Sequence, residues 1–113
     1  MIVSIVRFVS GLPDDEVQAR FEGRADRFRR VPGLLEKLYL RYRDTGEFGA
    51  VYVWESEDAL KRFRQSELGQ SIGMAYEVRS GPDFELADVR LLVQVEEELH
   101  ASSDRVGDRA GTS

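Results

Sequence analysis

The order in which strand-like and helix-like segments follow one another constrains this chain more than any other feature. Four segments have the β-branched, alternating composition of strands: residues 2–9, 34–43, 49–54 and 84–95. Two segments have the apolar spacing of amphipathic helices: residues 13–30 and 56–63. The order β-α-β-β-α-β predicts an α+β plait, in which a four-stranded antiparallel sheet carries both helices on one side.

The residues between these segments support this assignment. Pro13 suits the first turn of a helix, and Pro32 ends the same helix because it disfavours helical geometry at the residue before it. Ser56 is a good N-cap for the second helix, and the Asp-Thr-Gly run at 44–46 predicts a hairpin. Residues 66–82 mix helical spacing with glycines and a proline, so we predict a broken helix and a loop there.

The chain has 113 residues, a length typical of one domain. We predict that residues 1–99 form this domain. Residues 100–113 are small, polar or charged apart from Val106, and we expect them to be a disordered tail. The N-terminal apolar stretch is interrupted by Arg7 and is too short for a secretion signal or a membrane span. We therefore expect a cytoplasmic protein without a membrane partner.

The composition removes several classes of chemistry. The chain has no cysteine and its one histidine is His100, which excludes disulfides, thiolate metal sites and catalysis by a core histidine. We therefore expect no metal site. The formal net charge is −5, and two of the arginines of residues 20–30 are spaced four positions from an acidic side chain, as Glu16–Arg20 and Asp26–Arg30. We expect no nucleic-acid partner.

Side-chain alternation divides the predicted sheet into two faces. One face is aliphatic, and we expect it to form a dry core against helix phenylalanines: Val3, Ile5, Leu38, Leu40, Val51, Val53, Val89, Leu91 and Val93. The other face mixes aromatic, charged and small residues: Ser4, Val6, Phe8, Lys37, Tyr39, Arg41, Tyr52, Trp54, Asp88, Arg90 and Leu92. Tyrosine and tryptophan are favoured where one end of the side chain is apolar and the other polar, so we expect a second copy to cover the mixed face. The prediction is a homodimer with facing sheets.

Three motifs stand close together in the chain: VPGLLEK at 31–37, DTGEFGAVYVW at 44–54 and SEDA at 56–59. Together they resemble the YdhR-like monooxygenases, which belong to the dimeric α+β barrel superfamily alongside the antibiotic-biosynthesis monooxygenases. Ala50 stands where this family often has a second glycine. The resemblance is concentrated in residues 31–60, and the order of elements is compatible over residues 2–95.

The resemblance implies a ferredoxin-like βαββαβ plait that assembles as a homodimer, with a pocket in each subunit between the sheet and the helices. It also implies oxygenation of a small aromatic or polyketide-type metabolite by dioxygen. Some relatives do this without metal or flavin, so we expect no cofactor. A haem-degrading branch is similar around the Trp-Glu-Ser run at 54–56 but needs a pocket histidine and asparagine. The chain has no asparagine and no core histidine, which disfavours haem degradation.

In a cofactor-independent oxygenase the substrate supplies the electrons, and the protein stabilises the substrate's anion in a dry pocket. We assign catalytic roles to four residues of the predicted strands: Tyr39, Arg41, Tyr52 and Trp54. Tyr52 and Trp54 would wall the pocket, with Tyr52 donating to an oxyanion. Arg41 would lower the pKa of a bound phenol while Tyr39 relays the proton. Four more residues are candidates for substrate binding: Lys37, Phe21, Phe63 and Arg90.

Each of these residues also has a structural interpretation. Tyr52 and Trp54 would then pack in the dimer interface, and Tyr39 and Arg41 would form a cation–π or ion pair there. Lys37 would be solvated at a strand end. Arg90 would pair with a charged neighbour across the sheet.

The fold leaves two other functions open, because one fold hosts many chemistries. The first is a non-redox isomerase, cyclase or lyase, whose turnover would continue without oxygen. The second is a non-catalytic dimeric module that binds a small molecule and forms no product.

Overall fold

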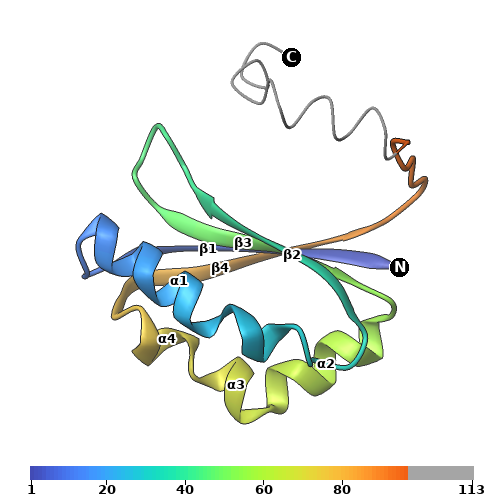
Figure 1. The fold of residues 1–113 in the computed structure, drawn as a ribbon, viewed down its shortest axis with the longest axis horizontal. Coiled ribbons are helices and arrows are strands. Elements are labelled where there is room, and N and C mark those ends of the chain that lie inside the picture. The colour runs from blue at the N-terminus through green and yellow to red at the C-terminus, as the bar shows by residue number, and fades with distance from the viewer. Residues whose placement is uncertain (97–113) are drawn as a thin grey trace.

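The computed structural model describes residues 1–96 of the chain (Figure 1). Its strands are β1 (Ile2–Ser10), β2 (Leu34–Arg41), β3 (Phe48–Trp54) and β4 (Val78–Asp88). Its helices are α1 (Asp14–Phe28), α2 (Glu57–Gln65), α3 (Glu67–Gln70) and α4 (Ile72–Ala75). This confirms the predicted α+β order. The end of the predicted domain and the predicted tail, residues 100–113, lie outside the described residues.

The four strands form a single sheet in the order β2-β3-β1-β4, and every neighbouring pair is antiparallel. All the labelled helices lie on one side of this sheet, with α1 and α2 to α4 side by side beneath it in Figure 1. None of the described helices covers the other face. The molecule therefore has two layers, and any pocket between them is bounded by β-strands above and helices below.

The helices begin where charge and capping favour them. α1 carries three acidic residues, Asp14 to Glu16, at the positive end of its dipole. α2 begins at Ser56, whose Oγ accepts a hydrogen bond from the backbone N–H of Ala59 at 3.2 Å. Ser66 caps α3 in the same way, accepting from Gly69 N–H at 3.1 Å. These caps fix the corner between α2 and α3.

The two faces of the sheet are the reverse of the prediction. The mixed set lies on the face that the helices cover, where Trp54 is 0% exposed, Ser4 2% and Tyr52 3%. The aliphatic set forms the open face, where Val51 and Val53 are half-buried and Leu38 is 50% exposed. The prediction that Tyr39, Tyr52 and Trp54 pack in a dimer interface is therefore wrong.

Ring size explains this arrangement. The helices present phenylalanines to the sheet, and the space between the layers is filled by rings from both sides. Phe63 of α2 lies 5.7 Å from the ring of Tyr52 and 5.3 Å from that of Trp54, measured between ring centroids. Phe21 of α1 lies 4.5 Å from Tyr39 and 6.1 Å from Phe48. Aromatic residues therefore make the core, since they bury the most apolar area per side chain.

β4 begins and ends earlier than the predicted strand at 84–95. It starts at Val78 and passes through Gly81 and Pro82, with register shifts against β1 between Arg7 and Ser10. It ends at Asp88, and the chain then leaves the sheet near the N-terminus (Figure 1). Residues 89–96 form an apolar arm without strand pairing, in which Leu91 is 81% exposed, Val93 75% and Val95 66%.

β2 contains a bulge at its start. Leu34 and Glu36 pair with consecutive residues of β3, Trp54 and Val53, so one residue of β2 is extra. The pairing is regular from Glu36 onward. Leu34 and Lys37 therefore share the helix-covered face, although their odd separation would place them on opposite faces of a regular strand.

Candidate functional site

A cavity of about 250 Å³ lies between the helix-covered face of the sheet and the segment from α2 to α4. Its walls are mainly apolar and include three residues predicted for the site, Tyr52, Trp54 and Phe63. Its polar lining consists of Ser4, Tyr52, Trp54, Arg64 and Gln70. The described residues that line the cavity include no carboxylate. It is a dry aromatic pocket with a few donors, which is the usual character of a small-molecule site.

The aromatic wall of the cavity is held rigidly. The rings of Tyr52 and Trp54 are stacked, with an interplanar angle of 7° and centroids 5.7 Å apart. Trp54 Nε1 donates a hydrogen bond to Ser4 Oγ at 3.1 Å, and both side chains are buried. This bond satisfies a donor that would otherwise be buried without a partner, and it fixes the orientation of the indole.

A second cluster of predicted residues lies beside the cavity, around a void of about 10 Å³. Phe21, Lys37 and Tyr39 line this void, and Tyr52 lines both the void and the cavity. Tyr76 completes the cluster and is 3% exposed. The hydroxyls of Tyr39 and Tyr76 are buried without a hydrogen-bond partner among the described residues. Buried polar groups are rarely left so, and this marks the cluster as a candidate for function.

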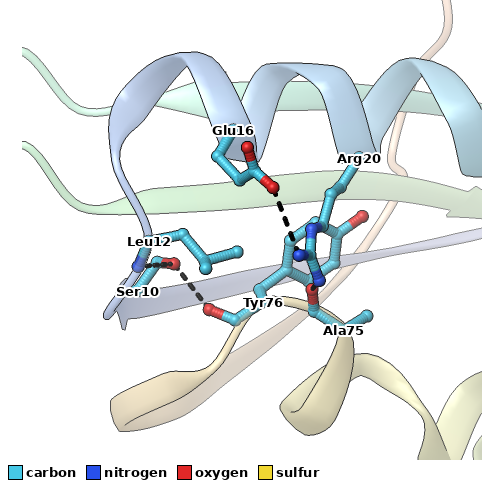
Figure 2. A network of polar contacts seen from close by, with 6 residues as sticks. All are labelled: Ser10, Leu12, Glu16, Arg20, Ala75 and Tyr76. Atoms are coloured by element: carbon cyan, nitrogen blue, oxygen red, sulfur yellow. Dashed lines mark hydrogen bonds and ion pairs between the residues drawn. The ribbon is translucent and has the colours of Figure 1, made fainter.

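A network of polar contacts holds Tyr76 in place (Figure 2). Ser10 at the end of β1 donates from Oγ to the carbonyl oxygen of Tyr76 and accepts from the N–H of Leu12. Arg20 of α1 donates from Nη1 to the carbonyl oxygen of Ala75 at 2.9 Å, and its Nη2 lies 3.3 Å from Glu16 Oε1. The α4–β4 connection is thereby tied to β1 and α1, so the ring of Tyr76 lies in the core. The neighbouring Met74, by contrast, is 88% exposed.

Burial keeps the three tyrosines of the site protonated. Burial, with a smaller contribution from Tyr76, raises the pKa of Tyr39 to about 12. Burial also raises the pKa values of Tyr52 and Tyr76, and the guanidinium of Arg24 opposes both increases. These hydroxyls are hydrogen-bond donors at neutral pH. The predicted relay through Tyr39 would need this phenol to give up a proton that burial holds on it.

Lys37 is enclosed by aromatic rings. Its Nζ lies 3.1 Å from the ring centroid of Phe28, 4.3 Å from that of Tyr39 and 4.7 Å from that of Tyr52. Burial lowers its pKa from 10.5 to about 6, and the positive charge of Arg24 adds to this effect. The expectation that Lys37 is solvated at a strand end is therefore wrong.

The structure places two predicted site residues elsewhere. Arg41 is 52% exposed at the end of β2, and its Nε lies 2.6 Å from Asp14 Oδ2 in an ion pair with α1. It lines none of the cavities near the aromatic cluster. Arg90 lies beyond the end of β4 and is exposed. The structure brings together the other six predicted residues, around the cavity and the void.

Several residues of the site were not predicted as functional. Ser4 belongs to the same alternating set as Tyr52 and Trp54, and its buried hydroxyl was the available signal. Leu60, Ile72 and Phe84 also line the cavity. Ile72 lies in the stretch at 66–82, where glycines obscure the helical spacing, and Phe84 lies just after this stretch.

Residues 1–96 lack two features that would indicate other functions. Within this range no group of three or more His, Cys, Asp or Glu side chains is arranged to hold a metal ion. None of the helices in this range is long and apolar enough to cross a bilayer.

Comparison with known families decides the relationship. Residues 5–87, which contain β2, β3 and most of β1 and β4, match the family model described as "Putative mono-oxygenase ydhR". The chain belongs to the ydhR family. This confirms the resemblance found in residues 31–60. No curated protein matches the chain significantly.

Solved structures share the fold of this ydhR-family chain. SnoaB, a cofactor-independent oxygenase from Streptomyces nogalater, has 23% identity and a TM-score of 0.66, over 81% of this chain and 95% of SnoaB. An antibiotic biosynthesis monooxygenase has 19% identity and a TM-score of 0.65, over 80% and 100% of the two chains. MhuD, a heme-degrader from Mycobacterium tuberculosis with two hemes bound in its active site, has 23% identity and a TM-score of 0.63, over 83% and 100%. At these identities the comparison establishes the fold alone.

Proposed function

We propose that this ydhR-family protein is a cofactor-independent monooxygenase that oxidises a small aromatic or polyketide-type metabolite with dioxygen. The cavity beneath the sheet carries the proposal, because its aromatic walls suit a flat ring system and its polar groups are donors. Membership of a family described as mono-oxygenases supports it. The shared fold with SnoaB, itself a cofactor-independent oxygenase, adds to this support.

The reaction uses the donors of the cavity and a water molecule as proton acceptor, because no carboxylate among the described residues lines the cavity. A phenol or enol loses its O–H proton to water, and the electron pair stays on the substrate oxygen. Tyr52, kept protonated by burial, donates a hydrogen bond to that oxyanion, and Arg64 in the cavity wall contributes positive charge. The anion then reduces dioxygen. For an anthrone, the CH₂ group becomes C=O, one oxygen atom enters the product and the other leaves as water, so no external reductant is required.

Oxygen consumption by the full chain, freed of metal and flavin, tests this function. The substrates are an anthrone, a hydroquinone and a naphthol, each supplied with ¹⁸O₂ and without oxygen. We expect oxygen uptake and an anthraquinone that has lost two hydrogens and gained one ¹⁸O. Product formation without oxygen would contradict the proposal in favour of an isomerase, cyclase or lyase. Saturable binding with no product from any of the three would contradict it in favour of a binding module.

We also propose that the protein is a homodimer joined through the open face of the sheet. This face carries half-buried valines from β1 and β3 and the 50% exposed Leu38 of β2. Charged residues such as Glu36 and Glu85 lie at the edges of this face, and its apolar centre is unfavourable in water. The arm at 89–96 adds exposed, alternating apolar residues without strand pairing, including Leu91 and Val93. A second copy of the chain would cover both, since a twofold interface is self-complementary.

A further inference from the structure

Lys37 lies in the wall of a groove outside the proposed oxygenation cavity. This groove, of about 340 Å³, runs between α1 and the start of β2. Its apolar walls include Ala25, Phe28, Leu34 and Tyr39, and Lys37 lies in the same wall. Lys37 does not line the 250 Å³ cavity, from which the ring of Tyr52 separates it. The two spaces therefore present different chemistry.

The surroundings of Lys37 offer no counter-ion for a positive charge among the described residues. No carboxylate among the described residues lies within 4.0 Å of its Nζ. The charged groups nearest to it on α1 are Arg24 and Arg29, and Glu36 lies beside it in the groove wall. The hydroxyls of Tyr39 and Tyr52 also lie beside Lys37, and they are uncharged because burial raises their pKa values.

Two forces of opposite sign act on the Lys37 amine. The faces of the surrounding rings attract an ammonium group. Desolvation without a counter-ion and repulsion from Arg24 both favour the neutral amine. Desolvation and the charge of Arg24 lower the pKa of Lys37 to about 6. A lysine desolvated in an apolar pocket next to another cation is the usual form of an activated amine nucleophile.

We propose that Lys37 is a nucleophilic amine and that the α1–β2 groove is a binding site for a small aromatic aldehyde, which Lys37 captures as an imine. The lone pair of Nζ attacks the carbonyl carbon to give a carbinolamine. The amine's two protons and the carbonyl oxygen then leave as water while the C=N bond forms, so no oxidant or reductant is needed. Phe28, Leu34 and Tyr39 suit the aromatic ring of such an aldehyde, while Arg29 and Glu36 line the polar part of the groove.

The composition of the chain supplies the control for a test. Lys37 and Lys61 are the two lysines among 113 residues. Lys61 lies on α2, exposed, with its Nζ 3.7 Å from Glu57 Oε2. After reductive labelling, trypsin would release Lys37 within residues 31–41 and Lys61 within residues 44–62, because both peptides are bounded by arginines. Mass spectrometry therefore reads the two amines of one molecule separately.

The experiment treats the full chain with benzaldehyde and cyanoborohydride over a range of pH. We expect Lys37 to be labelled roughly tenfold or more faster than Lys61 at neutral pH, since an ordinary lysine is almost fully protonated there. The rate at Lys37 should level off above about pH 6, where its amine is already neutral, while the rate at Lys61 should keep rising into alkaline pH. Equal rates, or faster labelling of Lys61, would overturn the proposal.

A second measurement covers a failure of benzaldehyde to enter the groove. Reductive methylation with ¹³C-formaldehyde places an NMR-visible methyl group on each lysine, and the two signals are assigned with the Lys37→Met and Lys61→Met proteins. A Lys37 signal that titrates below neutrality supports the nucleophile, and one that titrates together with Lys61 overturns it. If formaldehyde labels Lys37 first but benzaldehyde never does, the aromatic specificity of the groove is refuted. Neither measurement depends on oxygen chemistry, so the outcome is separate from that of the proposed monooxygenase.

Discussion

Trp54 and Ser4 join β3 to β1 across the floor of the cavity. Trp54 Nε1 donates to Ser4 Oγ at 3.1 Å, and the two side chains are 0% and 2% exposed. Ser4 pairs in register with Tyr52, so the indole of Trp54 reaches diagonally to the hydroxyl and lies flat against the Tyr52 ring. One hydrogen bond thus orients both aromatic walls of the site.

We expect Ser4→Ala to lower the free energy of unfolding by about 1–3 kcal/mol, because the indole N–H would be left buried without a partner. In the double variant Ser4→Ala/Trp54→Phe both polar groups are absent, so the combined loss should be smaller than the sum of the two single losses. Urea denaturation of the four proteins measures this coupling. Strictly additive losses would show that the hydrogen bond does not orient the indole.

Tyr52→Phe should slow oxygenation of an anthrone by roughly 10²–10³-fold, the usual effect of removing one donor to an oxyanion. The fold should be unaffected because the ring remains. Tyr42→Phe is the matched control, since Tyr42 contacts Arg7 at 4.0 Å and does not line the cavity. Initial rates of oxygen uptake measure both variants. An unchanged rate in Tyr52→Phe would exclude its hydroxyl as the donor.

Lys37 should make stability depend on pH. Folding lowers its pKa from 10.5 to about 6, so between these values the unfolded chain binds a proton that the folded chain has released. The free energy of unfolding therefore rises with pH across this window, and the penalty is complete below about pH 6. Lys37→Met should stabilise the protein at neutral pH, on the order of 2 kcal/mol, and remove this slope.

Urea denaturation at a series of pH values measures the slope for the wild-type protein and for Lys37→Met. Lys61→Met is the control and should keep the wild-type slope, because Lys61 is exposed. A wild-type slope that persists in Lys37→Met would assign it to another group.

The ion pair between Arg41 and Asp14 should contribute less than about 1 kcal/mol, since both side chains are more than half exposed and water screens their attraction. Arg41→Ala should leave the melting temperature almost unchanged. It should also leave anthrone oxygenation unchanged, because Arg41 lies away from the cavity. A large loss of activity in this variant would restore the catalytic role that the sequence suggested.

Leu38→Asp should convert the proposed dimer into a monomer, because it places a charge on the open face of the sheet. Met74→Asp is a matched control at an 88% exposed position on α4, away from this face. Sedimentation should give about twice the chain mass for the wild-type protein and for Met74→Asp. A wild-type monomer, or a Leu38→Asp dimer, would place the interface elsewhere.

The order of the strands and helices could be predicted from the sequence. Which face of the sheet the helices cover could not be predicted. Alternation separates Val51 and Val53 from Tyr52 and Trp54, but it is symmetric and does not say which set the helices cover. The aliphatic set suggested a dry core because valines are usually buried. The helices bring Phe28 and Phe63 to the sheet, and large rings fill the space between the layers better when the strand facing them also carries rings.

The site residues at regular strand positions could be predicted from the sequence. Tyr52, Trp54 and Lys37 occupy regular positions of β3 and β2, so their shared face follows from spacing. Arg41 shares that spacing but lies at the end of β2, where water and Asp14 are within reach. The sequence suggested Tyr76 as part of a pocket lid but not its buried position, which depends on a tertiary network with Ser10 and Arg20.

Because of the bulge at the start of β2, the position of Lys37 in the groove does not depend on the length of the loop before β2. Lys37 is held in place by the ladder that continues to Arg41, and the mismatch of one residue is absorbed between Leu34 and Glu36. Deleting Leu35 would restore regular pairing and leave both Leu34 and the amine on the helix-covered face. Evolution can therefore lengthen or shorten the α1–β2 connection by one residue without losing the amine.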